Sequence, residues 1–207
     1  MDFKMHLETA WQNTLQFIVP VILLTLVQMV VTIFSLGILL PVTTAGYMQS
    51  LLHALRDGRE PKIGDLFSQM NLFLPLFVYG LLAMLAVSLG FVLLIIPGFL
   101  VAGFIVFASI YVVPLMTDKK MGLIEALKGS WEMATREPLA DQIILMVLYL
   151  VLLSVGGSIA VAVLFTQPLA TFLVLSVYEE RLQGQQVVIE EEATPPPPPP
   201  HPTDKEA

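Results

Sequence analysis

Few residues of this chain have the types and the spacing that catalytic chemistry requires. Asp57, Glu60 and Asp65 lie close together in the sequence, and neighbouring carboxyl groups can act as a general acid and a general base. No histidine or cysteine lies among these three acids, so we interpret them as hydrated side chains of a loop. The chain contains no cysteine, which excludes disulfides, thiolate metal sites and thiol catalysis. We therefore expect that this protein is not an enzyme.

The histidines do not indicate a metal site. A protein metal site brings several ligands together, whereas His53 has no second histidine near it, and His6 and His201 lie in other regions. We expect His53 to be a hydrogen-bonded side chain at the edge of a membrane helix. No glycine-rich loop of the phosphate-binding kind is present, so we expect neither a metal nor a cofactor.

Gln28 lies midway along an apolar run, where an amide side chain needs a partner. We expect a hydrogen bond to a neighbouring helix, and contact with a substrate is the alternative. No apolar segment carries a charged residue near its centre. Charged groups inside a membrane usually mark ion and proton pathways, so their absence from the sequence argues against an ion-coupled transporter.

The composition indicates that the chain that positions these side chains is a membrane protein. Of the 207 residues, 56% are hydrophobic and only 13% are charged, and the mean hydropathy is +0.80. Soluble domains contain about 25% charged residues, so much of this surface must contact a lipid bilayer instead of water. The net charge of −7 provides no basic face, and we expect no nucleic-acid partner.

The apolar pattern predicts an all-α fold, a polytopic membrane bundle of about six transmembrane helices in three hairpins. Turns near Pro41, Pro97-Gly98 and Pro168 would join the two helices of each hairpin. The second and sixth helices are only about 15 residues long, so they either cross a thinned bilayer or form half of a hairpin that dips in and returns. The six predicted spans are 15–40, 42–56, 72–96, 99–116, 142–165 and 169–182.

Amphipathic segments follow the first two hairpins. Leu123, Leu127 and Trp131 repeat at helical spacing, which predicts a helix lying in the cytoplasmic interface. Basic residues and tryptophan in such positions favour contact with anionic lipid headgroups, although charge that merely sets topology explains the lysines equally well. The candidate headgroup contacts are Arg59, Lys62, Lys119, Lys120, Lys128 and Trp131.

The distribution of charge predicts the topology. All ten lysine and arginine residues fall in the N-terminal segment, the two connections between hairpins and the C-terminal segment. The turns within the hairpins carry no charge. Positively charged short loops stay in the cytoplasm, so we expect both termini to be cytoplasmic in a bacterial inner membrane. The N-terminal segment lacks the basic region of a cleaved signal peptide, and we expect it to be retained.

Two further segments have a distinct composition. Small residues that include Gly156 and Gly157 permit close helix packing on the fifth span, and a homo-oligomer contact is the alternative. Residues 185–207 combine acidic residues with six consecutive prolines, which favour extended polyproline II. We expect a membrane domain at 1–184 and a disordered cytoplasmic tail at 185–207. The tail would be either a stiff spacer or a ligand for a protein with an aromatic groove.

Two stretches resemble a bacterial membrane superfamily. Leu94–Gly98 reads Leu-Ile-Ile-Pro-Gly, and after one span Asp118–Trp131 contains the pattern Glu-Ala-Leu-x-x-Ser-Trp. This order is similar to the superfamily that includes the membrane domain associated with glycerophosphoryl diester phosphodiesterases and several domains of unknown function. The resemblance covers about residues 3–184. It implies a six-helix membrane domain. It does not imply phosphodiesterase activity, because that activity lies in a separate soluble domain of the parent proteins.

Three functions are compatible with this pattern. The first is a non-catalytic interaction or membrane-organising module that binds a protein partner through its cytoplasmic face or tail. The alternative is a transporter or lipid-handling protein, and the third is an accessory subunit of an enzyme. A polar cavity among the spans would favour the alternative, whereas a solid apolar core would count against it.

Overall fold

The computed structural model describes residues 2–93, 95–136, 138–158 and 161–193. Every regular element in these ranges is a helix, as the all-α prediction requires. The elements are α1 (Phe3–Gln16), α2 (Ile18–Phe34), α3 (Leu40–Asp57), two short 3₁₀ helices η1 (Ile63–Phe67) and η2 (Met70–Leu72), α4 (Phe73–Leu93), α5 (Ile95–Ser109), α6 (Val112–Thr117), α7 (Leu123–Arg136), α8 (Leu139–Ser158) and α9 (Val163–Ala193).

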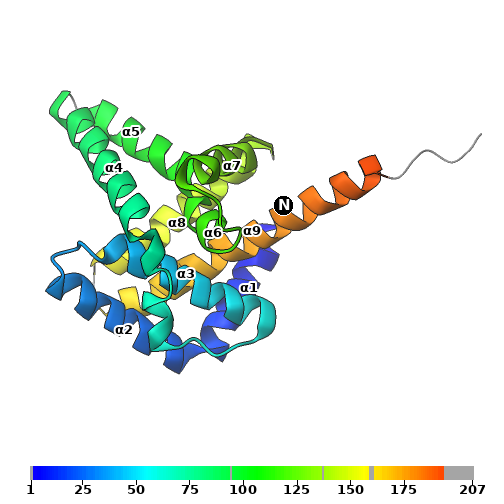
Figure 1. Cartoon of the computed structure of the whole chain (residues 1–207), viewed down its shortest axis with the longest axis horizontal. Helices are drawn as coiled ribbons and strands as arrows, with labels where there is room; N and C mark the ends of the chain where they lie inside the picture. The colour runs from blue at the N-terminus through cyan, green and yellow to red at the C-terminus, as the bar shows by residue number, and fades with distance from the viewer. Residues whose placement is uncertain (1, 94, 137, 159–160, 194–207) are drawn as a thin grey trace, which may run out of the picture.

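Helix α9 forms the centre of the fold. It packs against α1, α2, α3 and α8, and Figure 1 shows it crossing the molecule and continuing beyond the other helices. Its middle turns supply Phe172, Leu173, Leu175 and Tyr178, which are fully buried. The core therefore forms around a helix that the sequence pattern had marked as one of the shortest.

Prolines determine where several helices end. A proline ring clashes with the carbonyl group four residues earlier, and its nitrogen cannot donate a hydrogen bond. Pro20 lies four residues after Gln16, where α1 ends. Pro114 follows the end of α5 in a similar way. Each of these prolines occupies the first turn of the next helix, where a missing N–H group costs little.

Three helical segments are long and apolar enough to cross a membrane, Ile63–Leu93, Ile95–Thr117 and Leu139–Gly157. A fourth is possible if α1 and α2 are counted together, although they meet at an angle of 87°. The count of six spans is therefore not confirmed. The predicted span 15–40 is not one continuous helix, because the break before Pro20 separates α1 from α2 and α2 ends at Phe34.

The two short predicted spans have different outcomes. Helix α3 is mildly polar and half of it is buried in the protein, and it is not among the segments apolar enough to cross. Helix α9 is longer than predicted and continues to Ala193, nine residues beyond the domain boundary that we predicted at 184. The remaining predicted tail, including the six prolines, lies outside the described residues.

The predicted turn residues lie inside helices. Pro41 is in the first turn of α3, and the chain reverses just before it, where Leu36 and Gly37 have positive φ. Pro97 lies near the start of α5. The turn predicted at Pro168 is wrong, because this proline lies inside α9, and the connection from α8 comes before Val163.

Helices α4 and α5 form a hairpin that projects from the rest of the molecule (Figure 1). Gly90 and Gly98 allow the two backbones to approach, since a Cβ atom added to Gly90 would lie 3.0 Å from the Gly98 Cα atom. The predicted Pro97-Gly98 motif therefore serves helix packing. Most of the hairpin surface is apolar and exposed, as expected for helices that contact lipid.

Candidate functional site

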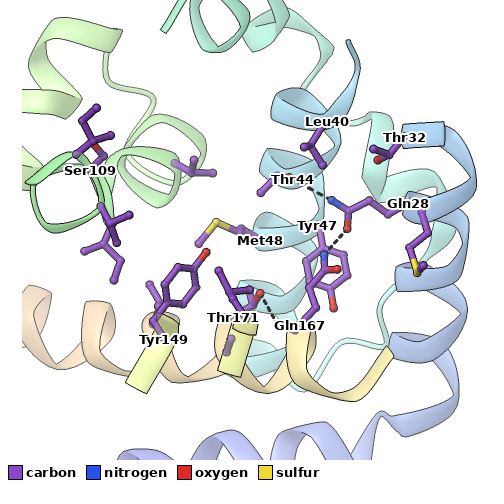
Figure 2. Close-up of a pocket in the computed structure, with 18 of the residues that line it drawn as sticks. Gln28, Thr32, Leu40, Thr44, Tyr47, Met48, Ser109, Tyr149, Gln167 and Thr171 are labelled. Carbon is purple, nitrogen blue, oxygen red and sulfur yellow. Dashed lines mark hydrogen bonds between the residues drawn. The ribbon is translucent and has the colours of Figure 1, made fainter. Parts of the chain in front are cut away.

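A cavity of about 670 Å³ lies within the helical part of the molecule. This volume falls in the usual range of small-molecule sites, roughly 300–1,000 Å³. Helices α2 and α3 form one wall, and α4, α5, α6, α8 and α9 complete it (Figure 2). It is lined by Gln28, Met29, Thr32, Ile33, Leu40, Thr44, Tyr47, Met48, Tyr79, Ile105, Val106, Ser109, Ile110, Val113, Tyr149, Leu153, Gln167, Ala170, Thr171 and Val174.

Two glutamine side chains form a hydrogen-bonded pair at the wall of the cavity. Gln167 donates from Nε2 to Gln28 Oε1 at 2.7 Å, and Gln28 donates from Nε2 to Thr44 Oγ1 at 3.1 Å. These bonds connect α9, α2 and α3 (Figure 2). The interhelical hydrogen bond that we predicted for Gln28 is confirmed, and the same side chain also lines the cavity.

The backbone around this pair is fixed by further hydrogen bonds. Thr171 donates to the Gln167 carbonyl at 2.9 Å, one turn along α9. Thr25 and Tyr47 are joined at 2.9 Å between their hydroxyl groups, which connects α2 to α3 next to Gln28. Because both tyrosine and threonine are fully buried there, the amide of Gln28 is held by a rigid support.

Hydroxyl groups approach the cavity from other walls. Tyr79 of α4 and Ser109 of α5 are hydrogen-bonded to each other. Figure 2 shows the Tyr149 hydroxyl group of α8 pointing into the cavity, toward the side that carries Met48. Polar groups therefore face a mostly apolar space from more than one direction, an arrangement typical of ligand sites.

The mouth of the cavity is apolar. Among the lining residues, Ile33, Leu40 and Leu153 have exposed side chains, with 69%, 44% and 39% of their surface accessible. These residues belong to α2, α3 and α8, the last of which is one of the membrane-span candidates. We take these exposed aliphatic side chains as the mouth of the cavity, which would face lipid in a bilayer.

The chemistry available in the cavity is that of binding. None of the described residues that line it is charged. Its polar atoms belong to amides, threonine and serine hydroxyls and tyrosine hydroxyls, which donate and accept hydrogen bonds without changing charge near neutral pH. The arrangement can hold a ligand and orient it, and no nucleophile with an adjacent base lies in the described lining.

Three charged residues and a tyrosine from three segments meet at a separate place, which we call the charged cluster: Arg56, Asp118, Tyr178 and Glu179. Arg56 Nη2 donates to Asp118 Oδ2 at 2.9 Å, and Arg56 Nε donates to Glu179 Oε1 at 2.8 Å. The Tyr178 hydroxyl donates to Asp118 Oδ2 at 3.0 Å. The cluster connects the end of α3, the connection after α6 and the middle of α9.

Helix α1 is attached beside this cluster by His6. Its Nδ1 atom lies 2.7 Å from Ser176 Oγ, and its Nε2 atom forms a short contact with Glu180. His6 is buried, with 1% of its surface exposed. The segments that we predicted on one side of the membrane are therefore adjacent in the fold.

Two opposing effects act on the pKa of Asp118. Partial burial by itself would raise the pKa of this carboxyl group, because the charged form loses hydration. The hydrogen bonds and positive charge of Arg56, and the hydrogen bond from Tyr178, outweigh burial and hold the pKa of Asp118 below its usual value. Asp118 is therefore a carboxylate at neutral pH and acts as the acceptor for both partners.

The predicted headgroup contacts come from two parts of the chain, and their contact with lipid stays a prediction. Arg59 forms an ion pair with Asp65 at 2.6 Å, and Lys62 lies in the same connection before η1. The other four candidates lie in the connection before α7 and on α7 itself: Lys119, Lys120, Lys128 and Trp131. Trp131 is half-exposed and also packs against Phe104 and Phe107 of α5.

Two other predictions from composition have separate outcomes. A Cβ atom on Gly156 would collide with the Thr166 side chain, so this glycine permits the close packing of α8 and α9 that we predicted. Nothing lies within 4 Å of such an atom on Gly157. His53 is hydrogen-bonded to Gln49 and Asp57 and is exposed at the end of α3.

Sequence reasoning missed most of the cavity. Gln167 was assigned to a turn beside Pro168, and Tyr79 and Tyr149 were counted only as parts of apolar spans. His6 was missed as well, although Phe3, Leu7 and Ala10 already repeat at helical spacing around it. That repeat was the available signal for α1, whereas no signal in the sequence brings α2, α5 and α9 together.

The fold and the cavity define an all-helical, membrane-embedded protein with a mostly apolar internal site. No protein-family model, curated protein or solved structure matches this chain. The resemblance to the phosphodiesterase-associated membrane superfamily therefore stays a prediction.

Proposed function

We propose that this protein is a lipid-handling membrane protein that binds a lipid-like molecule in its internal cavity. The observation that carries the proposal is the cavity itself, which combines an apolar lining with the hydrogen-bonded pair Gln28–Gln167. A solid apolar core would have favoured the non-catalytic interaction module instead. The size of the cavity and its mouth of exposed aliphatic side chains both support a ligand that partitions into the bilayer.

The position of the cavity supports this proposal further. Its walls include α4, α5 and α8, and these helices contribute the three segments apolar enough to cross a membrane. A molecule inside the cavity would therefore lie at the depth of the hydrocarbon. A water-soluble ligand would have to cross an apolar mouth to reach the side chains of Gln28 and Gln167, which we call the amide pair. It would lose its hydration on the way, which costs free energy.

The test is to fill the cavity and measure bound lipid. Val106 lines the cavity on α5, and Val106→Trp adds an indole ring to that space. Native mass spectrometry of the protein extracted in native-lipid discs should show co-purifying lipid on the unmodified chain and at least tenfold less on Val106→Trp.

The matched control is Val92→Trp, because Val92 is 80% exposed on α4 and lies outside the cavity lining. This variant should retain its lipid. Equal lipid occupancy in both variants would contradict the proposal. A stoichiometric protein partner recovered in place of lipid would favour the interaction module and its cytoplasmic contact surface.

We also propose that both termini are cytoplasmic in a bacterial inner membrane, with the hairpin topology of about six spans. The gathering of charged segments around Arg56, Asp118 and His6 supports one charged face, as the positive-inside rule requires. Because the chain has no cysteine, single cysteines can be introduced at Lys120 and Ser35. A membrane-impermeant maleimide applied to intact cells should label Ser35→Cys and should spare Lys120→Cys, and the reverse pattern would refute this orientation.

A further inference from the structure

The polar groups of the cavity are all uncharged, and this restricts the chemistry of a ligand. Among the described lining residues, the groups that can reach a ligand are amides and hydroxyls, with Gln28, Gln167 and Tyr149 as the largest. A phosphate or an ammonium group placed there would lose its hydration and would find no opposite charge. A hydroxyl or a carbonyl group would exchange its hydrogen bonds with water for hydrogen bonds with these side chains.

We infer that the ligand is a neutral amphiphile, a molecule with hydroxyl or ester groups and long hydrocarbon chains, of the diacylglycerol type. This inference rests on the proposed function, because it names the class of lipid for the same cavity. The polar part would lie against the amide pair, and the chains would extend toward the aliphatic mouth.

The amide pair is prepared for such a group. The bonds Gln167 to Gln28 and Gln28 to Thr44 use one acceptor and two donors of the two amides. No hydrogen bond to Gln167 Oε1 is present within the described part of the chain, so this oxygen can accept from a ligand hydroxyl. The Gln167 amide also has a second N–H group, which can donate to a ligand carbonyl.

The mouth indicates how the ligand enters. Ile33, Leu40 and Leu153 are exposed at the rim, and none of them can bind a charged headgroup. A neutral lipid can pass sideways from the hydrocarbon with its polar group dehydrated, whereas a phospholipid keeps its headgroup in water. The rim and the amide pair therefore select the same class of molecule by independent means.

The experiment compares two lipids that share their chains and differ only in charge. The purified protein in detergent is titrated with 1,2-dioleoylglycerol or with 1,2-dioleoyl phosphatidic acid, and binding is followed by native mass spectrometry. The neutral lipid should bind at least tenfold more tightly than the anionic lipid. Gln28→Leu and Gln167→Leu, which keep the side-chain volume and remove the amide, should each weaken binding of the neutral lipid at least fivefold.

The controls distinguish the loss of a contact with the ligand from unfolding of the protein. Gln12→Leu makes the same change on the exposed face of α1, outside the cavity, and should leave binding unchanged. If one glutamine variant is too unstable to purify, Tyr149→Phe tests the same idea through the deletion of one oxygen atom.

The possible outcomes distinguish the two proposals. Tighter binding of the phosphatidic acid, or equal binding of both lipids, would overturn the inference about charge. If Val106→Trp abolishes the binding of these lipids, the proposed lipid-handling function is still supported. If neither lipid binds, or if Val106→Trp leaves binding intact, the proposed function fails and the inference fails with it.

Discussion

The region around α9 and the α4–α5 hairpin are stabilised in different ways. Helix α9 packs against α1, α2, α3 and α8, and the charged cluster adds hydrogen bonds between segments far apart in the chain. In the hairpin, the candidate span Ile63–Leu93 has only 11% of its most apolar window buried inside the protein. One region is held by contacts within the protein, and the other depends on its lipid environment.

This difference explains where the cavity lies. It occupies the boundary between the two regions, with Gln28 and Gln167 on the side of α9 and with Tyr79 and Ser109 on the side of the hairpin. The amide pair is supported by the rigid region. The opposite wall belongs to helices with fewer protein contacts, so that wall is the part best able to move when a ligand enters.

The largest expected effect comes from Gly46, which lies in the rigid region where α3 touches η1. A Cβ atom there would lie 2.6 Å from the Leu66 carbonyl carbon and would also collide with the Asp65 carbonyl oxygen. Both obstacles are backbone atoms, which cannot rotate away. We expect Gly46→Ala to lower the free energy of unfolding by about 3 kcal/mol, the upper end for overpacking.

The measurement is the thermal unfolding midpoint in detergent micelles. Gly64→Ala is the matched control, because nothing lies within 4 Å of an added Cβ atom at Gly64 in the neighbouring helix η1. It should change stability by no more than about 0.5 kcal/mol. Equal midpoints for the two variants would mean that the packing of η1 on α3 does not limit the stability of this region.

A smaller effect is expected from Asp118 in the charged cluster. The pKa of Asp118 is lower in the folded protein than in the unfolded chain, so its contribution to stability is complete above the unfolded value of about 3.9. That contribution is lost as the pH falls through the lower, folded-state pKa. Asp118→Asn should therefore cost about 1–2 kcal/mol at pH 7, reduced by the partial solvation of the cluster, and this cost should shrink as the pH falls below about 3.9.

The pH dependence of thermal unfolding distinguishes the contribution of Asp118 from that of other acidic residues. Asp57→Asn is the control, because Asp57 is exposed and contacts only His53 among the described residues. Its midpoint should remain close to that of the unmodified protein between pH 3 and pH 7. A deficit of Asp118→Asn that persists unchanged at pH 3 would show that the side-chain shape, and not the charge, is what the cluster requires.

The presence of apolar spans at α4, α5 and α8 could be predicted from the sequence, although the predicted end of the α8 span at residue 165 lies seven residues beyond Ser158. Each is a continuous apolar run bounded by proline or charge, and these local signals do not depend on the rest of the fold. The helical class and the close packing at Gly156 followed from the same kind of signal. The candidates for headgroup contact were identified by residue type alone, and the fold distributes them over two separate connections.

Other features depend on tertiary contacts that the local sequence does not encode. Pro168 was interpreted as a turn because proline usually ends a helix, yet α9 continues through it in an apolar environment. That error concealed Gln167 and with it half of the amide pair. The break at Phe17 was overlooked because the apolar composition continues across it, although Pro20 provided a local reason for α1 to end.

The smallest effect is expected in the hairpin, at Gly98. A Cβ atom there would collide with the Cδ1 and Cγ atoms of Phe91, but this neighbour is an aromatic side chain and not backbone. The ring also packs edge-on against Phe99 and is partly exposed, so it can rotate toward the lipid. We expect Gly98→Ala to cost about 1 kcal/mol, the lower end for overpacking. Gly103→Ala, in the same helix with nothing within 4 Å, should be neutral or slightly stabilising, since alanine favours helix. If Gly98→Ala costs as much as Gly46→Ala, the hairpin is as rigid as the region around α9, and the wall of the cavity that we expect to move is fixed.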